Sequence, residues 1–231
     1  MIALSSEAWD AVRLSAQVSA VATVLSLPFA IAIAYLLARR QFFGRELLNG
    51  LVHLPLILPP VVTGYVLLLA FGRQGPIGAV LFDWFGITLA FTWSGAALAA
   101  AIMAFPLMVR AIRLAIEAVD PKLEEAAMTL GAGPVWVFAT VTLPLIAPGI
   151  LAGTVLGFAK AIGEFGATIT FVSNIPGQTQ TIPSAIYAFL QVPGGEQDAL
   201  SLVIIAVIIA MGALLLSEWL ARRVAARIAS A

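Results

Sequence analysis

The chain has 231 residues, of which 61% are hydrophobic and only 10% are charged. Soluble domains carry roughly 25% charged residues, so this composition excludes an ordinary soluble protein and indicates an integral membrane protein. Twelve basic residues balance twelve acidic ones, which gives no reason to expect a nucleic acid as partner. Since the chain has no cysteine and a single histidine, His53, which cannot form a metal site by itself, we expect no cofactor.

Windows of about 20 apolar residues predict five membrane-spanning helices. They cover residues 14–38, 48–71, 89–110, 145–172 and 199–220. Pro28, the pair Pro59-Pro60 and Pro148 lie within three of these spans or near their starts, so the first, second and fourth helices are expected to be kinked or broken. We find no internal repeat and no linker, and therefore predict one all-α transmembrane domain over residues 1–231.

The basic residues of the loops are unevenly distributed between the two sides of this bundle. One side carries Arg39, Arg40, Arg45, Arg110, Arg113, Lys122, Arg222, Arg223 and Arg227, whereas the other carries Arg13 and Arg73. Cytoplasmic loops are enriched in lysine and arginine. The side with nine basic residues is therefore predicted to be cytoplasmic, which places the C-terminus in the cytoplasm and the N-terminus outside. The first span is expected to act as an uncleaved signal anchor, because no positively charged segment precedes it.

The loop between the third and fourth spans, about residues 111–144, contains a predicted short helix. Asp120 and Pro121 are typical of an N-cap and a first helical residue, and Gly131 of a C-cap. The predicted apolar face consists of Leu123, Ala126, Ala127 and Leu130. The other face is polar and consists of Lys122, Glu124, Glu125 and Thr129. At about 15 Å the helix is too short to cross a bilayer, so it must lie along a surface or project from it.

Glu125-Ala126-Ala127, Gly131 and the run Val141 to Pro144 resemble the EAA loop of binding-protein-dependent ABC importer permeases. The family commonly has Ile in place of Val141, a conservative difference. The resemblance implies the type I ABC importer permease fold, in which this loop forms a coupling helix seated in a groove of a cytoplasmic ATPase subunit. It makes these residues candidates for coupling to the ATPase: Glu124, Glu125, Ala126, Ala127, Gly131, Leu143 and Pro144.

The chain lacks the sequence pattern of an ATPase. A P-loop requires a lysine within a glycine-rich segment, and neither Lys122 nor Lys160 completes one. We therefore expect that the chain is not an enzyme and that a separate subunit hydrolyses ATP. Five helices are also few to enclose a solute path, which favours a two-fold dimer with the path at its interface.

Lys160 and Glu164 stand four residues apart in the predicted fourth helix and can form an ion pair. Ionisable groups at membrane depth usually face a cavity or a partner helix, although a pair that satisfies itself at a helix interface is an equal alternative. Small residues such as Gly157, Gly163 and Gly166 fit a dimer contact or a translocation wall. The candidate residues for a pathway or a dimer interface are Thr63, Lys160, Glu164 and Thr168.

The segment after this helix resembles molybdate permeases of the ABC importer family. The likeness lies in Gly-Glu-Phe-Gly-Ala-Thr at 163–168, Asn-Ile-Pro-Gly at 174–177, Thr-Ile-Pro-Ser-Ala at 181–185 and Pro-Gly-Gly-Glu at 193–196. It implies a multi-pass protein of the cytoplasmic membrane that imports molybdate by alternating access. The implied partners are a second copy of the chain, two copies of a cytoplasmic ABC ATPase subunit and a periplasmic or extracellular oxyanion-binding protein, besides membrane lipid. A short re-entrant or surface segment is expected near Thr181 or Pro183.

Three alternatives remain open at this point. The anion could be sulfate, tungstate or another oxyanion, because such anions share charge and near-tetrahedral shape. A secondary transporter driven by a proton or sodium gradient would use Lys160 and Glu164 as relay residues, but such folds are usually built from repeats. An intramembrane enzyme would need a recognisable catalytic spacing, which the chain lacks.

Overall fold

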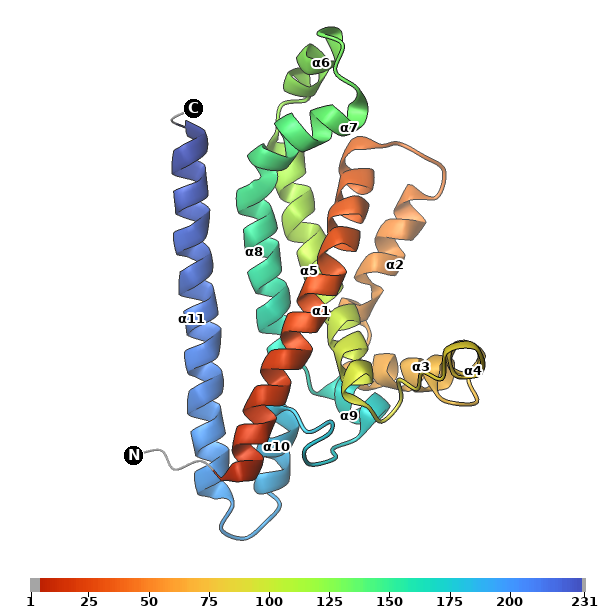
Figure 1. The fold of residues 1–231 in the computed structure, drawn as a ribbon, viewed down its shortest axis with the longest axis vertical. Helices are drawn as coiled ribbons and strands as arrows, with labels where there is room; N and C mark the ends of the chain where they lie inside the picture. Colours follow the sequence, from red (N-terminus) through yellow and green to blue (C-terminus); the bar gives the residue numbers. More distant parts are fainter. Residues whose placement is uncertain (1–4, 230–231) are drawn as a thin grey trace.

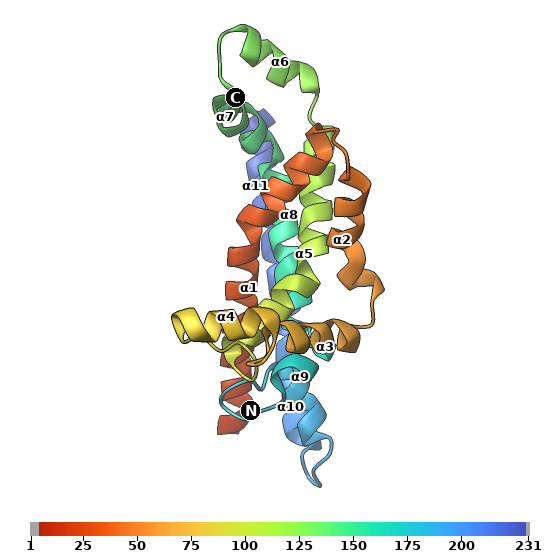
Figure 2. The ribbon, with the colours of Figure 1, turned by 90° about the vertical axis from the view of Figure 1, so that its right-hand side faces the viewer.

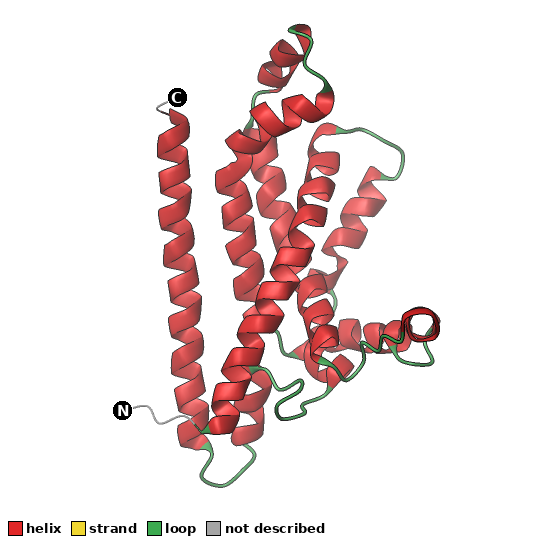
Figure 3. Cartoon of the chain, viewed as in Figure 1, coloured by secondary structure: helices red, strands yellow, loops and turns green. Residues whose placement is uncertain are grey.

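The computed structural model describes residues 5–229, and within them every regular element is a helix (Figure 3). The helices are α1 (Ser6–Arg39), α2 (Arg45–Ile57), α3 (Pro60–Phe71), α4 (Pro76–Phe85), α5 (Trp93–Ala118), α6 (Pro121–Thr129), α7 (Pro134–Val137), the π-helical turn η1 (Phe138–Thr142), α8 (Leu143–Ile162), α9 (Gly166–Val172), α10 (Ile182–Phe189) and α11 (Glu196–Ala229). The all-α fold class predicted from the sequence is confirmed.

Four helical segments are long and apolar enough to cross a membrane: Ser6–Arg39, Trp93–Ala118, Pro134–Ile162 and Glu196–Leu220. The pair α2 and α3 supplies a fifth crossing if it is counted as one span, although the chain bends by 113° between the two helices. The break expected in the second predicted span is therefore confirmed. The break falls at Pro59-Pro60, because Pro60 has no N–H to donate and each proline disfavours helical geometry in the residue before it.

The fourth predicted span, 145–172, is wrong at its C-terminal end. The helix stops at Ile162, and residues 166–172 form the separate helix α9 after a non-helical turn. By contrast, Pro28 and Pro148 remain inside the continuous helices α1 and α8, so the chain is not broken at these two prolines.

The core of the bundle is formed where α5 packs between α1 and α8 (Figure 1). Alanines of α5, among them Ala96, Ala99 and Ala100, are fully buried and allow close approach of helices. On α8, a Cβ added at Gly157 would lie 2.6 Å from the sulfur of Met108 in α5. Gly157 therefore lets α8 pack closely against α5 within the chain.

Different helices lie at the two ends of the molecule. α6, α7 and the last turns of α11 lie at one end, whereas the start of α1 and α10 lie at the other (Figures 1 and 2). α3 and α4 lie across the direction of the long helices, toward the end with α10 (Figure 2). The described starts of α1 and α11 thus share one end, and the two helices run in the same direction.

Candidate coupling loop and intramembrane ion pair

The loop helix α6 is set by local capping signals. The carboxylate of Asp120 accepts a hydrogen bond from the backbone N–H of Lys122 at 3.0 Å, and Pro121 occupies the first turn. At the other end, Gly131 adopts φ +89°, and the N–H groups of Gly131 and Ala132 donate to carbonyl oxygens of the last turn. The helix thus has the limits that these residues predicted.

Glu124 does not share the exposed face of the other polar residues of α6. Its side chain is buried, and its Oε1 accepts a hydrogen bond from Thr142 Oγ1 at 2.8 Å and lies 3.3 Å from Nη2 of Arg39. The expectation that grouped Glu124 with Lys122 and Glu125 is therefore wrong for Glu124. The reason is tertiary: two partners distant in sequence lie on that side of the helix.

The outward surface of the loop is largely apolar. Leu123, Met128 and Leu130 of α6 are exposed, as are Val135 and Trp136 of α7. Leu130 and Val135 have relative exposures of 89% and 84%. A cluster of exposed large apolar residues beside a polar rim marks an interaction surface. Sequence reasoning missed Val135 and Trp136, because a four-residue helix shows no periodic pattern; the aromatic residue after Gly133-Pro134 was the available signal.

The candidate coupling residues fall into two parts of this loop. Glu125, Ala126 and Gly131 are exposed on α6 and its C-terminal turn, and Ala127 beside them is half-buried. Leu143 and Pro144 are the first two residues of α8 and follow the π-helical turn η1 without a break, within the helical segment Pro134–Ile162. The bond from Thr142 to Glu124 ties the second part to the first.

Lys160 and Glu164 form an ion pair of 2.7 Å between Nζ and Oε2. The prediction that both residues lie on one helix is wrong, because Glu164 lies in the turn between α8 and α9. Its second oxygen, Oε1, accepts a hydrogen bond at 3.0 Å from the N–H of Ala167 and so caps α9. The side chain of Glu164 is 2% exposed and that of Lys160 is 29% exposed, so the carboxylate depends on these partners more than the ammonium does.

Thr63 and Thr168 lie where α3 packs against α9. A Cβ added at Gly64 would lie 2.5 Å from the carbonyl oxygen of Ala167, which shows how closely the two helices approach. Thr168 is buried and donates to the carbonyl oxygen of Phe165 at 2.9 Å. Thr63 is also buried, and its hydroxyl has no hydrogen-bond partner within residues 5–229.

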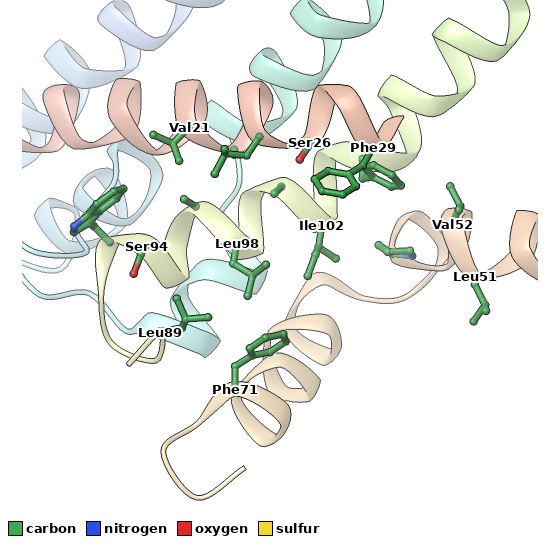
Figure 4. Close-up of a pocket in the computed structure, with 17 residues that line it drawn as sticks. Val21, Ser26, Phe29, Leu51, Val52, Phe71, Leu89, Ser94, Leu98 and Ile102 are labelled. Atoms are coloured by element: carbon green, nitrogen blue, oxygen red, sulfur yellow. The ribbon is translucent and has the colours of Figure 1, made fainter. Parts of the chain in front are cut away.

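An apolar groove with a volume of about 790 Å³ lies between α1, α2 and α5 (Figure 4). Phe29 and Val21 of α1, Leu51 of α2 and Leu98 of α5 point toward it, and Ser26 and Ser94 contribute its few polar atoms. Such a lining does not suit a dianion, which needs hydrogen-bond donors when it leaves water. None of the candidate pathway residues lines this groove.

The apolar helices that are long enough to cross a bilayer define an integral membrane protein rather than a soluble module. More specifically, the chain belongs to the family of binding-protein-dependent transport system inner membrane components, whose model matches residues 26–230. The resemblance found in the sequence is confirmed by this match.

Relatives of similar length are named as permeases. The chain is 63% identical over 219 residues to the molybdenum transport system permease protein ModB of Escherichia coli K12, covering 95% of this chain and 96% of the relative. It is 57% identical over 214 residues to ModB of Haemophilus influenzae, covering 93% of each. A sulfate transport system permease protein, CysW of Synechococcus elongatus, is 38% identical over 174 residues, which are 75% of this chain and 60% of the relative.

A solved structure of a bacterial ABC transporter that imports the acidic polysaccharide alginate has the same fold. The TM-score is 0.73 at 18% sequence identity, with 95% of this chain and 80% of that chain covered. At this identity the likeness concerns the fold alone. It places the described helices in the type I importer permease architecture.

Proposed function

We propose that this chain, as one transmembrane domain, is the permease subunit of an ATP-driven importer of molybdate. The observation that carries the proposal is helix α6, which projects beyond the ends of the spans and, with α7 beside it, exposes apolar side chains near Glu125. A surface of this kind needs a partner, and the EAA pattern indicates an ATPase. The substrate is inferred from the likeness to molybdenum transport permeases over nearly the whole chain.

The proposed assembly contains two copies of this chain, two ATPase subunits and an external oxyanion-binding protein. ATP-driven closure of the ATPases draws the two α6 helices together, and the helix bundles rotate as rigid bodies to open the path outward. The permease supplies a gated path and no bond chemistry. It requires no cofactor for this task.

Sulfate is the second candidate, supported by the likeness to a sulfate permease. Molybdate and sulfate are both tetrahedral dianions, and a path of hydroxyls and backbone N–H groups would pass either one. In this proposal the choice between them is made by the binding protein. The greater identity to molybdenum permeases favours molybdate.

The test is uptake of labelled molybdate by liposomes that contain the chain with its ATPase and binding protein. We expect uptake that requires ATP and is abolished when the binding protein is omitted. Unlabelled tungstate and sulfate, added in excess in parallel, report the preference. Uptake that follows a proton or sodium gradient without ATP would contradict the proposal and favour a secondary transporter.

We further expect an external N-terminus and a cytoplasmic C-terminus. Nine loop lysines and arginines lie on one proposed side against two on the other, and the start of α1 and the end of α11 lie at opposite ends of the molecule (Figure 1). Reporter fusions after residue 8 and after residue 228, one active outside and one active inside the cell, measure this directly. Activity of both fusions on the same side would mean that the number of spans is even.

A further inference from the structure

Glu124 differs from the other charged residues of α6 in the side of the helix that it occupies. Lys122 and Glu125 are exposed, as expected of a loop that meets a partner, whereas Glu124 has a relative exposure of 8%. A buried carboxylate is strongly unfavourable unless it is paired and hydrogen-bonded. Its position therefore depends on the partners that surround it.

Those partners, Thr142 and Arg39, come from two other parts of the chain. Thr142, at the end of η1 and directly before α8, donates its hydroxyl to Glu124 Oε1 at 2.8 Å. Arg39, the last residue of α1, places Nη2 3.3 Å from the same oxygen. The same Nη2 donates at 2.9 Å to the carbonyl oxygen of Val119, the residue that ends α5. One carboxylate oxygen thus joins α6 to the end of α1 and to the start of α8, and Arg39 in turn is bonded to the residue that ends α5.

The other ion pairs of the described residues have a local character. Arg113 with Glu117 and Arg222 with Glu218 are four residues apart on one helix, Lys160 with Glu164 is also four residues apart, and Arg45 and Glu46 are neighbours in the sequence. Each of these pairs joins groups that are already close together along the chain. The pair of Arg39 with Glu124 is the one among the described residues that connects helices distant in the sequence.

We propose that Glu124 is a positioning residue that transmits displacement of α6 to α1 and α8. The inference rests on the proposed function, in which an ATPase moves α6. The hydrogen bond from Thr142 to the carboxylate is charge-assisted, and the ion pair with Arg39 adds electrostatic attraction, so a displacement of α6 would pull on both long helices rather than bend the loop. Glu125 and the apolar residues on the outer side would bind the ATPase, and Glu124 on the inner side would carry the motion into the membrane.

The experiment uses the complete transporter in liposomes and measures molybdate taken up per ATP hydrolysed. In Glu124→Gln, which keeps an acceptor oxygen but loses the charge, we expect this ratio to fall about tenfold, as expected for loss of one charge-assisted bond. The ATPase should still copurify with the variant, because the outer surface is unchanged. In Thr142→Val we expect a fall of about threefold, and Thr142→Ser, which restores the hydroxyl, should return the ratio to the wild-type value.

Glu117→Gln is the matched control, because it makes the same change in an ion pair within α5. A merely structural defect lowers the amount of folded transporter and so reduces uptake and hydrolysis together, leaving the ratio unchanged. A wild-type ratio in Glu124→Gln, with or without a lower yield, would overturn the inference. Wild-type liposomes that take up no molybdate would contradict the proposed function itself, and the inference with it.

Discussion

Replacing Glu125 with lysine is expected to abolish uptake while the chain still inserts into the membrane. Glu125 is exposed on α6 and contributes to no span, so the change reverses one charge of the proposed docking surface and leaves the bundle intact. Central residues of an interface contribute roughly 2–4 kcal/mol, so we expect a loss of about 30-fold or more in uptake. Copurification of the ATPase with the permease, measured beside uptake, separates lost docking from lost transport.

Replacing Gly131 with tryptophan should give the same loss by a different route. No atom lies within 4 Å of a Cβ added at Gly131, but the residue has φ +89°, which costs about 1–2 kcal/mol for an ordinary side chain. The turn between α6 and α7 would therefore be redirected. Gly133→Ala is the matched control, since Gly133 has open space and φ −70°.

For the charge reversal the control is Glu46→Lys, because the side chain of Glu46 is 81% exposed and lies outside α6. Both controls should transport at the wild-type rate. Normal ATPase assembly and normal uptake in Glu125→Lys and Gly131→Trp would remove the assignment of α6 as the coupling helix.

The sequence predicted α6 closely because every signal that limits it is local. The carboxylate of Asp120 caps the N-terminus, Pro121 is suited to the first turn, and Gly131 supplies the left-handed residue after the last turn. Each signal acts within a few residues. The existence of apolar spans was equally accessible, since it depends on composition over about 20 residues.

Features that depend on contacts between elements were not accessible in the same way. The helix ends at Ile162, but the residues before and after this point are both apolar. A hydropathy window therefore predicts one span where the structure has the two helices α8 and α9. Glu124 looks like a surface residue until Arg39 and Thr142 are placed beside it. Periodicity reports the faces of a helix, but it does not say which face meets the rest of the chain.

Removing both charges of the pair Lys160 and Glu164 is expected to be less harmful than removing one. The Nζ and Oε2 atoms are 2.7 Å apart, and the carboxylate is almost fully buried. Breaking a buried pair by removing one partner costs roughly 3–5 kcal/mol, because a charge remains buried without compensation, whereas a neutral pair of similar volume is tolerated. The three variants to compare are Lys160→Met, Glu164→Gln and the double variant.

The structure also predicts an order between the two single variants. Lys160→Met leaves the 2% exposed carboxylate unpaired, whereas Glu164→Gln leaves an ammonium whose side chain is 29% exposed and reaches water more readily. Glutamine also keeps an oxygen that accepts the hydrogen bond from the N–H of Ala167. We therefore expect Lys160→Met to be the least stable, Glu164→Gln to be intermediate and the double variant to be the most stable of the three.

Thermal unfolding of the purified chain and uptake by the complete transporter provide the two measurements. Glu218→Gln is the control, because its pair with Arg222 is exposed and contributes less than about 1 kcal/mol. If the double variant were as impaired as the sum of the single variants, the two residues would act independently. If all three variants behaved like the wild type, the pair would lie neither at the dimer interface nor along the pathway. The path would then be sought at Thr63 and Thr168, whose buried hydroxyls lie where α3 packs against α9.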